Sequence, residues 1–597
     1  MRELEYPFDP KWVIKKKKSI KRQLMDEASN LMYKKIAILG GMTTNDIKDI
    51  LDLFLLNYGI KADFYESEYN KYYEDGAFEN KKLEEFKPDV IYICTSIRNI
   101  NDFPTLLETK ESIDNKLNSL FKRFEGLWNH INETYHCPII QNNFEYPFFR
   151  LMGNKDASSV HGRVNFVTRL NQLFYDYANI NTNFYICDIN YLSACYGLEN
   201  WSKPSMWYLY KYAVNIDAIP YLSFNVANII KSIYGKNKKV LNLDLDNTLW
   251  GGVIGDDGAE NIEIGKETAI AENYNEFQEY IKLHKDMGIL LTLNSKNDEN
   301  VAMKGFDRPD SILKKDDFVN KKINWNPKNQ NLIETANELN LLPESFVFVD
   351  DNPAERHIVS ETLKGVAVPE ISNVENFINV IDKSGFFEVT SLSDDDIKRN
   401  EMYKENEKRE ALKNTFTNYK DYLLSLEMKA EVKAFEPMYM SRIAQLTNKS
   451  NQFNLTTKRY TIKELEDMSR DKNYITLYGK LTDKFGDNGV VSLIIGKLDD
   501  NNKNILHIML WLMSCRVLKR DMEFAMMDEL VKVSKANNIK KLIGYYYPTE
   551  KNIMVKDFYL LQDFKKVKED ENGNATYEFD VTDNYKNKQD VIRIIKN

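Results

Sequence analysis

The chain has 597 residues, with 81 Lys and Arg, 90 Asp and Glu, and a hydrophobic fraction of 43%. One core rarely grows beyond about 250–300 residues, so this length predicts several domains. The formal net charge of −9 is not that of a basic nucleic-acid-binding protein, and no nucleic-acid partner is expected.

No apolar stretch approaches the length of roughly 18 residues that a membrane span needs, and none is expected. The first residues lack the apolar segment of a signal peptide. The five cysteines are scattered without CxxC spacing, a pattern typical of free thiols in a reducing compartment. These features predict a cytoplasmic protein.

The first predicted domain, residues 1–235, contains short apolar runs at 35–41, 90–94 and 184–188. Between them lie helical patterns, for example at 46–58. Strands that alternate with helices predict a parallel α/β layer.

The second predicted domain, residues 236–392, has three apolar runs that each end at a polar residue, with two helical patterns between them. The runs lie at 239–244, 289–294 and 345–350, and the helices at 272–287 and 329–341. This alternation predicts a Rossmann-like sheet, in which functional groups gather at the carboxyl ends of the strands.

The remaining chain divides into a linker helix at 393–427 and a third domain at 428–597. Ser393 and three aspartates predict the start of that helix. Further strands are expected at 474–478, 490–495, 505–512 and 541–545, with a helix at 521–535. The order predicts an antiparallel meander followed by a strand–helix–strand unit. The whole chain is therefore predicted to be a multidomain α/β protein.

Two carboxylates, Asp244 and Asp246, follow the first strand of the second domain. One carboxylate can attack phosphorus while the other transfers a proton. Such oxygens are also ligands of Mg²⁺, which offsets the repulsion between a carboxylate and a phosphate. Alone, this pair is weak evidence for a phosphate site.

Three further elements follow in order: Ser295 ends the next strand, Lys328 precedes a helix, and Asp350 and Asp351 end a third strand. The order resembles the signature of the haloacid-dehalogenase (HAD) superfamily. The resemblance implies a nucleophile, a general acid/base, phosphate-positioning hydroxyls, a charge-stabilising lysine and Mg²⁺ ligands. The implied nucleophile is Asp244, and the implied general acid/base is Asp246. Thr248 and Ser295 would position the phosphate, and Lys328 would stabilise charge. Asp350 and Asp351 would bind Mg²⁺ together with Asp244 and the backbone carbonyl of Asp246.

Glycines at 251–258 predict a tight flap, and the short intervals between motifs leave no room for a large cap domain. A capless site tolerates large substrates, such as a group carried on a protein.

Longer matches narrow the resemblance. LDLDNTLWGGVIGDDG at 243–258 and SFVFVDDNPAER at 345–356 resemble the FkbH-like proteins of polyketide and surface-glycan pathways. QLTNKSNQFNLT at 445–456, FGDNG at 485–489 and SCRVL at 514–518 extend the similarity over nearly the whole chain.

The FkbH resemblance implies a Mg²⁺-dependent phosphatase that also transfers an acyl group. Such enzymes take 1,3-bisphosphoglycerate, pass the glyceryl group through a protein thioester, remove the phosphate, and deliver glyceryl to the phosphopantetheine thiol of an acyl carrier protein. Some members are expected to have a cysteine between the two aspartates, where this chain has Leu245.

Cys515 is the alternative thiol. Its sequence position predicts a strand-to-helix junction, where Arg516 and a helix N-terminus would lower the pKa of the thiol. A structural cysteine is the competing interpretation. The third domain resembles a GNAT-type acyltransferase fold, in which this junction binds pyrophosphate, so Arg516 is a candidate phosphate ligand. Recognition of a pantetheine arm is favoured over acetyl-CoA chemistry.

The first domain resembles an SGNH-hydrolase-like fold in outline only. Gly40, Gly41 and Met42 stand where a serine motif would lie, and no Ser-His-Asp set can be assembled. Ser158, Ser159 and His161 are close in sequence, but a loop is the better interpretation. We therefore expect a docking or structural domain without catalysis.

Two alternatives to glyceryl transfer remain. One is a plain HAD phosphatase acting on a sugar phosphate or similar metabolite, which Leu245 favours. The other is a binding or acyl-transfer module with an inactive HAD domain, against which the intact set of Asp244, Ser295, Lys328 and Asp350 argues. The sequence does not identify the donor, the final acceptor or the oligomeric state.

Overall fold

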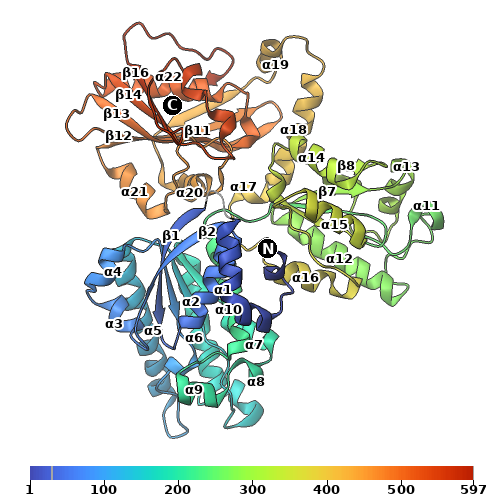
Figure 1. Ribbon diagram of the computed structural model, residues 1–597, viewed down its shortest axis with the longest axis vertical. Helices are drawn as coiled ribbons and strands as arrows, with labels where there is room; N and C mark the ends of the chain where they lie inside the picture. Colours follow the sequence, from blue (N-terminus) through green and yellow to red (C-terminus); the bar gives the residue numbers. More distant parts are fainter. Residues whose placement is uncertain (28–30, 596–597) are drawn as a thin grey trace. The chain divides into compact units, whose positions relative to one another are not determined.

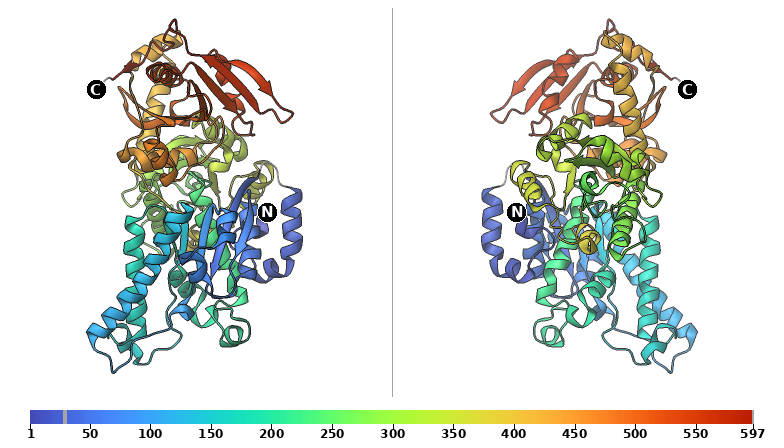
Figure 2. Two further views of the ribbon diagram at one scale, coloured as in Figure 1. Left: turned by 90° about the vertical axis from the view of Figure 1, so that its left-hand side faces the viewer. Right: turned by 90° about the vertical axis from the view of Figure 1, so that its right-hand side faces the viewer.

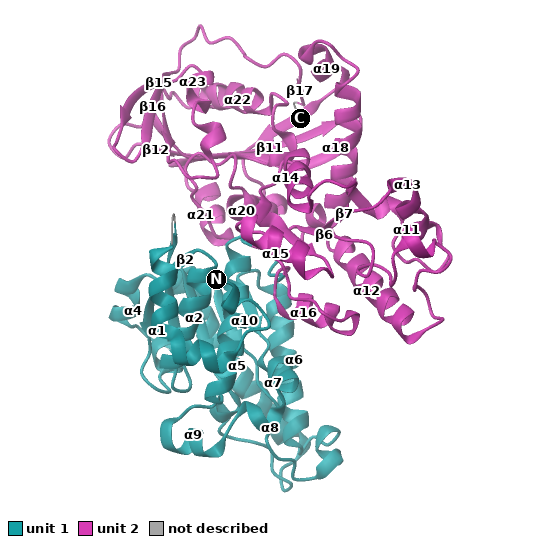
Figure 3. Cartoon of the chain, turned by 45° about the vertical axis from the view of Figure 1, so that its right-hand side comes forward, with its two compact units in different colours: residues 1–236, 388–391 teal, residues 237–387, 392–597 magenta. Residues whose placement is uncertain are grey.

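The computed structural model describes residues 1–27 and 31–595, which form two compact units. Unit 1 comprises Met1–Lys236 and Glu388–Ser391, and unit 2 comprises Asn237–Phe387 and Leu392–Asn597 (Figure 3). Within the described residues, unit 1 contains one sheet and unit 2 contains two, and helices connect the strands of the two parallel sheets. The prediction of a mixed α/β protein with parallel sheets is confirmed. None of the helices in the described part of the chain is both long and apolar enough to cross a membrane.

Unit 1 contains a parallel five-stranded sheet in the order β2-β1-β3-β4-β5. Its strands are β1 (Met32–Gly40), β2 (Ile60–Glu66), β3 (Val90–Cys94), β4 (Ile139–Asn142) and β5 (Phe184–Cys187). Alternate side chains of β1 enter different cores. Ile36 and Ile38 pack in one, and Ala37 and Leu39 pack in the other. A strand buried on both faces is typical of a parallel sheet covered by helices on each side.

Helices cover both faces of this sheet (Figure 1). One core receives side chains from α1 (Pro10–Asp26), α2 (Asn45–Asn57) and α10 (Ile219–Ile233). The other receives side chains from α5 (Lys110–Tyr135) and α6 (Arg163–Ile180). Unit 1 is therefore a three-layer α/β structure.

The first sheet of unit 2 is parallel and has the order β8-β7-β6-β9. Its strands are β6 (Val240–Leu243), β7 (Leu290–Ser295), β8 (Phe318–Ile323) and β9 (Phe346–Val349). All four residues of β6 and of β9 are buried. Because β6 lies between β7 and β9, the carboxyl ends of these three strands meet at one edge of the sheet.

Two cores hold helices against this sheet. Leu241, Leu243 and Val349 pack with Phe277 of α12 (Ala269–Asp286) and with α16 (Phe377–Lys383). The other face packs against α14 (Lys328–Glu338) and α15 (Pro353–Thr362). Capping side chains start two of these helices. Thr268 accepts a hydrogen bond from Ala271 N before α12, and Asn352 accepts one from Ala354 N before α15.

The single linker helix expected at 393–427 is wrong. Three helices occupy the segment: α17 (Asp394–Ile397), α18 (Arg399–Lys413) and α19 (Tyr419–Ser425). Ser393 and Asp396 form a capping box at α17, so the predicted start is correct. The break between α17 and α18 lies in the turn that follows Asp396. Asp396 is buried and accepts hydrogen bonds from Ser393 and Gln445, which holds this turn in place before α18 begins.

The second sheet of unit 2 is mixed and has eight strands in the order β15-β16-β14-β13-β12-β11-β10-β17. The antiparallel meander predicted from the sequence consists of β11 (Tyr474–Asp483), β12 (Gly486–Leu498) and β13 (Ile505–Met513). The chain then passes through α22 (Met522–Ala536) into β14 (Lys541–Tyr546), which pairs with β13 in parallel.

The outer strands are β10 (Lys429–Lys433), β15 (Lys565–Glu569), β16 (Ala575–Asp580) and β17 (Arg593–Ile594). Figure 2 shows β14 to β16 as the red part of this sheet. Separate cores lie on its two faces, one containing α22 and the other α20 (Met440–Lys449) and α21 (Ile462–Arg470).

Candidate active site

A cluster of carboxylates surrounds one lysine at the carboxyl edge of the first sheet of unit 2. Asp244 follows β6, and Asp350 and Asp351 follow β9. One carboxylate oxygen from each lies within 4.8 Å of the others. Nζ of Lys328, the first residue of α14, lies 3.0 Å from Oδ1 of Asp244 and 2.5 Å from Oδ2 of Asp350. The fold thus brings together four residues that span more than 100 positions of sequence.

Burial makes these charges act strongly on each other. The side chain of Asp350 is fully enclosed, and that of Lys328 is 4% exposed. Burial and the neighbouring carboxylate of Asp244 raise the pKa of Asp350, and Lys328 opposes the shift. Burial and Asp244 also raise the pKa of Asp351. Three carboxylates around a single ammonium leave an excess of negative charge, which is costly in a buried site unless a cation compensates it.

These residues fit Mg²⁺. The ion takes hard oxygen ligands, commonly one or two carboxylates with water and substrate phosphate oxygens. Asp244, Asp350 and Asp351 would hold it, and its charge would relieve the repulsion that raises the carboxylate pKa values. When bound, such an ion polarises a phosphoryl oxygen and neutralises charge near the nucleophile.

The side chain of Asp246 is held outside this cluster. Its Oδ1 accepts hydrogen bonds from Trp250 Nε1 at 2.9 Å and from Ile254 N at 3.1 Å, and its Oδ2 accepts one from Asn297 Nδ2 at 2.9 Å. Burial raises the pKa of Asp246, although these hydrogen bonds oppose the shift. The carboxylate is therefore fixed in orientation, as a proton-transferring group must be. Leu245, between the two aspartates, is fully buried in the core.

The two hydroxyl residues lie at the same edge. Ser295 ends β7 and Thr248 lies in the loop after β6, and both are buried. Thr248 Oγ1 accepts a hydrogen bond from the backbone N–H of Asp351 at 3.2 Å. This contact ties the loop after β6 to the loop after β9, so the two loops that carry the carboxylates share one geometry.

A closed loop forms the predicted flap over residues 247–265. Gly251 and Glu263 pair as an antiparallel bridge, and Gly252 has φ 91° and donates its N–H to Asn247 Oδ1. Trp250 is fully buried and packs against Phe306 and Gly305. Only the short α11 (Ile254–Asp257) interrupts the flap before α12. No separate cap domain is inserted here, as the spacing predicted.

Three residues of this site were not singled out from the sequence. Asn297 and Trp250 position Asp246, and Arg356 NH1 donates to the backbone oxygens of Asp350 and Asp351 at 2.8 and 2.7 Å. Trp250 and Arg356 lie within the motifs at 243–258 and 345–356, and those motifs are the sequence signal that could have identified them. Asn297 lies two residues beyond Ser295 and had none, because its role depends on a contact across 51 positions.

Cys515 and Arg516 lie elsewhere in unit 2. Cys515 packs against the core that contains Val240 and Leu290, at the amino ends of β6 and β7. Asp244 lies beyond the carboxyl end of β6, and the four residues of this strand span roughly 13 Å. Cys515 begins a short 3-10 turn (Cys515–Val517), and α22 begins only at Met522, so the cysteine is not at a helix N-terminus as expected.

In unit 1, the Ser158, Ser159 and His161 segment forms the loop that was preferred from the sequence. Ser158 ends a 3-10 turn (Gly153–Ala157), and Nε2 of His161 lies 2.9 Å from the backbone oxygen of Glu108. Gly41 at the end of β1 accepts a hydrogen bond from Asn99 Nδ2 through its backbone oxygen. Both contacts join a side chain to the backbone of another segment of unit 1.

Comparisons with known proteins found one family model and several solved structures that parts of this chain resemble. Residues 35–231 match the family model for the FkbH N-terminal domain. A crystal structure of the N-terminal part of the Bacteroides fragilis protein BF1531, which contains a phosphatase domain and is complexed with Mg, is 29% identical with a TM-score of 0.58. The match covers 63% of this chain and 99% of that one. No curated protein matches the chain.

Two acetyltransferase structures match a smaller part of the chain. The ribosomal-protein-S18-alanine N-acetyltransferase from Escherichia coli is 8% identical with a TM-score of 0.20, over 26% of this chain and 99% of that one. A GNAT-family acetyltransferase from Streptococcus pneumoniae is 13% identical with a TM-score of 0.22, over 26% of this chain and 100% of that one.

Proposed function

Because the chain is an FkbH-like protein, we propose that it is a Mg²⁺-dependent HAD-type phosphatase that acts on a phosphorylated three-carbon donor of the 1,3-bisphosphoglycerate type. We further propose that it passes the glyceryl group to the thiol of an acyl carrier protein in a polyketide or surface-glycan pathway. The observation that carries the phosphatase proposal is the cluster of Asp244, Lys328, Asp350 and Asp351.

Phosphate removal follows from the roles of these side chains. A carboxylate oxygen of Asp244 attacks phosphorus, the bond to the leaving oxygen breaks, and an aspartyl-phosphate forms. Asp246, held by three donors, supplies the proton to the leaving oxygen and then takes one from the attacking water. Lys328 stabilises the negative charge of the phosphoryl group beside Asp244. Mg²⁺, when bound, adds charge neutralisation at the same place.

Glyceryl transfer requires a thiol in addition. A thiolate attacks the carbonyl carbon of the acyl phosphate, the C–S bond forms, the C–O bond to phosphate breaks, and inorganic phosphate leaves. Leu245 is buried in the core, so the position between the aspartates offers no thiol. Cys515, which is half-buried, remains the candidate. Since it lies at the opposite end of β6 from Asp244, the two reactions would occur at separate sites, and the flexible pantetheine arm of a carrier protein could present the group to Asp244.

A plain phosphatase acting on a sugar phosphate is the second candidate function, and the separation of Cys515 from Asp244 favours it. The third possibility, a binding module with an inactive HAD domain, has less support because Asp244, Ser295, Lys328 and Asp350 are all present at one edge of the sheet. The SGNH-like and GNAT-like descriptions of the first and third domains remain predictions.

The test is the intact mass of the protein after incubation with 1,3-bisphosphoglycerate and Mg²⁺, with and without hydroxylamine. A hydroxylamine-labile glyceryl or phosphoglyceryl adduct on a Cys515 peptide is expected. Cys515→Ser should remove this adduct without stopping phosphate release, whereas Cys195→Ser, a change at an exposed cysteine of unit 1, should leave both.

Phosphate release from an unmodified protein would overturn the acyl-transfer proposal and leave the plain phosphatase. Absence of phosphate release from both 1,3-bisphosphoglycerate and a panel of sugar phosphates would overturn the phosphatase proposal itself.

A further inference from the structure

A second polar pocket lies within unit 2, at the edge of the first sheet opposite the carboxylate cluster. Lys239 precedes β6, Leu290 begins β7 and Ser345 precedes β9, and all three line the pocket. Its other side comes from α18, α20 and the turn that contains Cys515. Its enclosed volume is about 100 Å³. This is smaller than the usual pocket for a drug-sized ligand, and it suits a small anionic group or the end of a larger ligand.

The pocket carries an excess of positive charge. Five cationic side chains line it: Lys239, Arg399, Arg442, Lys449 and Arg516. Four of them pair with two aspartates at the start of the linker. Arg399 and Lys449 contact Asp396, while Arg442 and Arg516 contact Asp395. Glu344, which also lines the pocket, pairs with Lys551. Two aspartates facing five cations leave three positive charges uncompensated.

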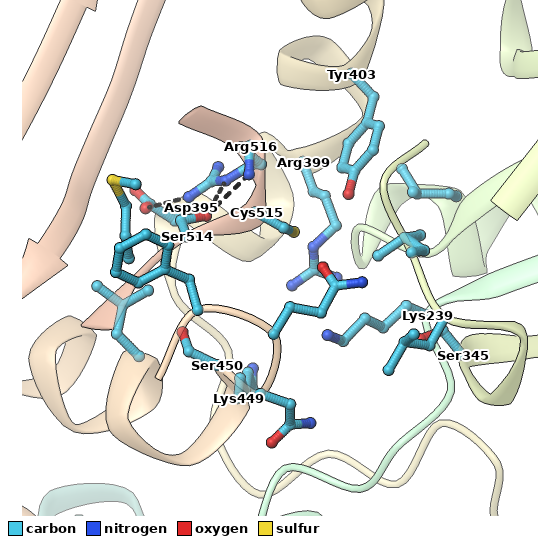
Figure 4. A pocket seen from close by; sticks show the side chains of 18 of the residues that line it. Lys239, Ser345, Asp395, Arg399, Tyr403, Lys449, Ser450, Ser514, Cys515 and Arg516 are labelled. Atoms are coloured by element: carbon cyan, nitrogen blue, oxygen red, sulfur yellow. Dashed lines mark hydrogen bonds and ion pairs between the residues drawn. The ribbon is translucent and has the colours of Figure 1, made fainter. Parts of the chain in front are cut away.

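Lys239 stands out within this cluster. Among residues 1–27 and 31–595, its ammonium has no hydrogen-bond or ion-pair partner, although it lies in the interior of the pocket. Figure 4 shows Lys239, Arg399 and Cys515 pointing into the same space. Lys239 is half-buried, and an ammonium that has no partner and lies among other cations attracts an anion that the protein does not itself provide.

The pKa values of three cationic side chains that line the pocket agree with its excess of positive charge. Burial lowers the pKa of Lys239, even though Cys515 and Glu344 oppose the shift. Burial also lowers the pKa of Lys449 to about 8, and burial together with Arg516 lowers the pKa of Arg442 to about 10. Each of these cations therefore gains if a further negative charge enters the pocket.

We infer that this pocket binds a phosphate group and holds it beside the thiol of Cys515. A phosphate monoester offers three acceptor oxygens and up to two negative charges, which matches an unpaired ammonium next to the guanidinium of Arg399. A carboxylate would satisfy fewer of these donors. The inference rests on the acyl-transfer part of the proposed function, in which Cys515 is the candidate thiol, and deepens it by naming the group held beside that thiol. It involves no residue of the Asp244 cluster and needs no phosphatase activity.

The phosphate group can come from two sources. One is a free three-carbon phosphate, and the other is the phosphodiester of a pantetheine arm. They differ in charge, since the monoester is dianionic near neutral pH and the diester carries a single charge. Binding of one and not the other would distinguish a metabolite site from a carrier-arm site.

Alkylation of Cys515 provides a local readout in the full-length chain. The rate of iodoacetamide labelling at Cys515 is followed by peptide mass spectrometry with increasing inorganic phosphate, against sodium chloride at matched ionic strength. Cys195, an exposed thiol in unit 1, serves as the internal control. We expect phosphate to slow labelling of Cys515 at least about fivefold and to leave Cys195 unchanged. 3-Phosphoglycerate, which is a monoester, and a peptide with a phosphopantetheinylated serine, which contains the diester, are then compared as competitors.

Variants separate this site from the phosphatase site. Lys239→Met should weaken protection of Cys515 by phosphate about tenfold, the effect of losing one charge-assisted hydrogen bond. Lys238→Met is the matched control, because Nζ of Lys238 donates to the backbone oxygens of Glu344 and Gly365 and does not line the pocket. Asp244→Asn should retain protection, and Lys239→Met should retain phosphatase activity towards p-nitrophenyl phosphate.

Equal protection by phosphate and chloride, or undiminished protection by phosphate in Lys239→Met, would overturn the inference. If Lys239→Met is unstable in a melting experiment, Lys449→Met provides the same comparison from α20. Loss of phosphatase activity in Asp244→Asn with full protection at Cys515 would support both sites independently.

Discussion

Lys239 and Asp244 lie at opposite ends of one buried strand, the first directly before Val240 of β6 and the second directly after Leu243. The strand therefore joins a cation-rich pocket to a carboxylate-rich site, and its four residues are completely buried between them. The chemistry of the two ends can be tested separately, because neither set of side chains contacts the other.

Asp244→Asn should reduce phosphate release by at least about 10³-fold, because the amide cannot act as the nucleophile. The replacement is isosteric, and Lys328 keeps its contact with Asp350, so the melting temperature should change little. Initial rates with p-nitrophenyl phosphate and Mg²⁺ measure the effect. Asp256→Asn, an exposed residue of the flap, is the matched control. Activity above one tenth of the original would exclude Asp244 as the nucleophile.

Asp351→Asn should raise the Mg²⁺ concentration needed for half-maximal activity about 10- to 100-fold, since it removes one of three clustered carboxylates. Removal of divalent ions with EDTA should abolish activity in the unaltered protein, and added Mg²⁺ should restore it. A titration of rate against Mg²⁺ measures both effects. An unchanged titration curve in the variant would place the metal on other ligands.

Glu145→Gln should make unit 1 less sensitive to alkaline pH. Burial raises the pKa of Glu145 to about 7, one carboxylate oxygen accepts from Ile97 N, and within the described residues the other has no hydrogen-bond partner. Because the folded pKa lies above the unfolded value of 4.5, the protonated form stabilises the fold below pH 4.5. That contribution is lost as the pH rises through 7.

The loss for Glu145 amounts to about 3 kcal/mol between pH 4.5 and pH 8. Denaturation of the unaltered protein, Glu145→Gln and the exposed control Glu133→Gln at pH 5 and pH 8 measures it. The amide that Glu145→Gln introduces stays neutral, so only this variant should gain relative stability at pH 8. The same pH dependence in all three proteins would refute the assignment.

Arg409→Met should destabilise unit 2 by about 3–5 kcal/mol, since it leaves the buried carboxylate of Asp483 without its main partner. Nε and NH2 of Arg409 donate to the two oxygens of Asp483, each at 2.7 Å, and both side chains are enclosed. Lys413→Met, which breaks an exposed pair with Glu410 on the same helix, should cost less than about 1 kcal/mol. Urea denaturation of both variants provides the comparison, and equal midpoints would contradict the prediction.

The sequence by itself determined the order of strands and helices around the carboxylates, because each strand is an uninterrupted apolar run that ends at a polar residue. In a parallel sheet such ends meet at one edge, so Asp244, Ser295, Lys328, Asp350 and Asp351 could be predicted as one site before any coordinates. The prediction of a single linker helix was wrong. Its first break, between α17 and α18, follows the buried Asp396, whose partner Gln445 comes from a distant helix.

The position of Cys515 and Lys239 in a separate pocket, at the edge of the sheet opposite Asp244, became evident only from the folded chain. No local pattern marks Lys239, since a lysine before a strand is ordinarily a solvated residue. Its missing partner and the surrounding cations arise from β6, α18 and α20 folding together. The distinction has a physical basis. Periodicity and strand ends are local properties of a chain, whereas charge balance inside a pocket depends on residues that only packing brings together.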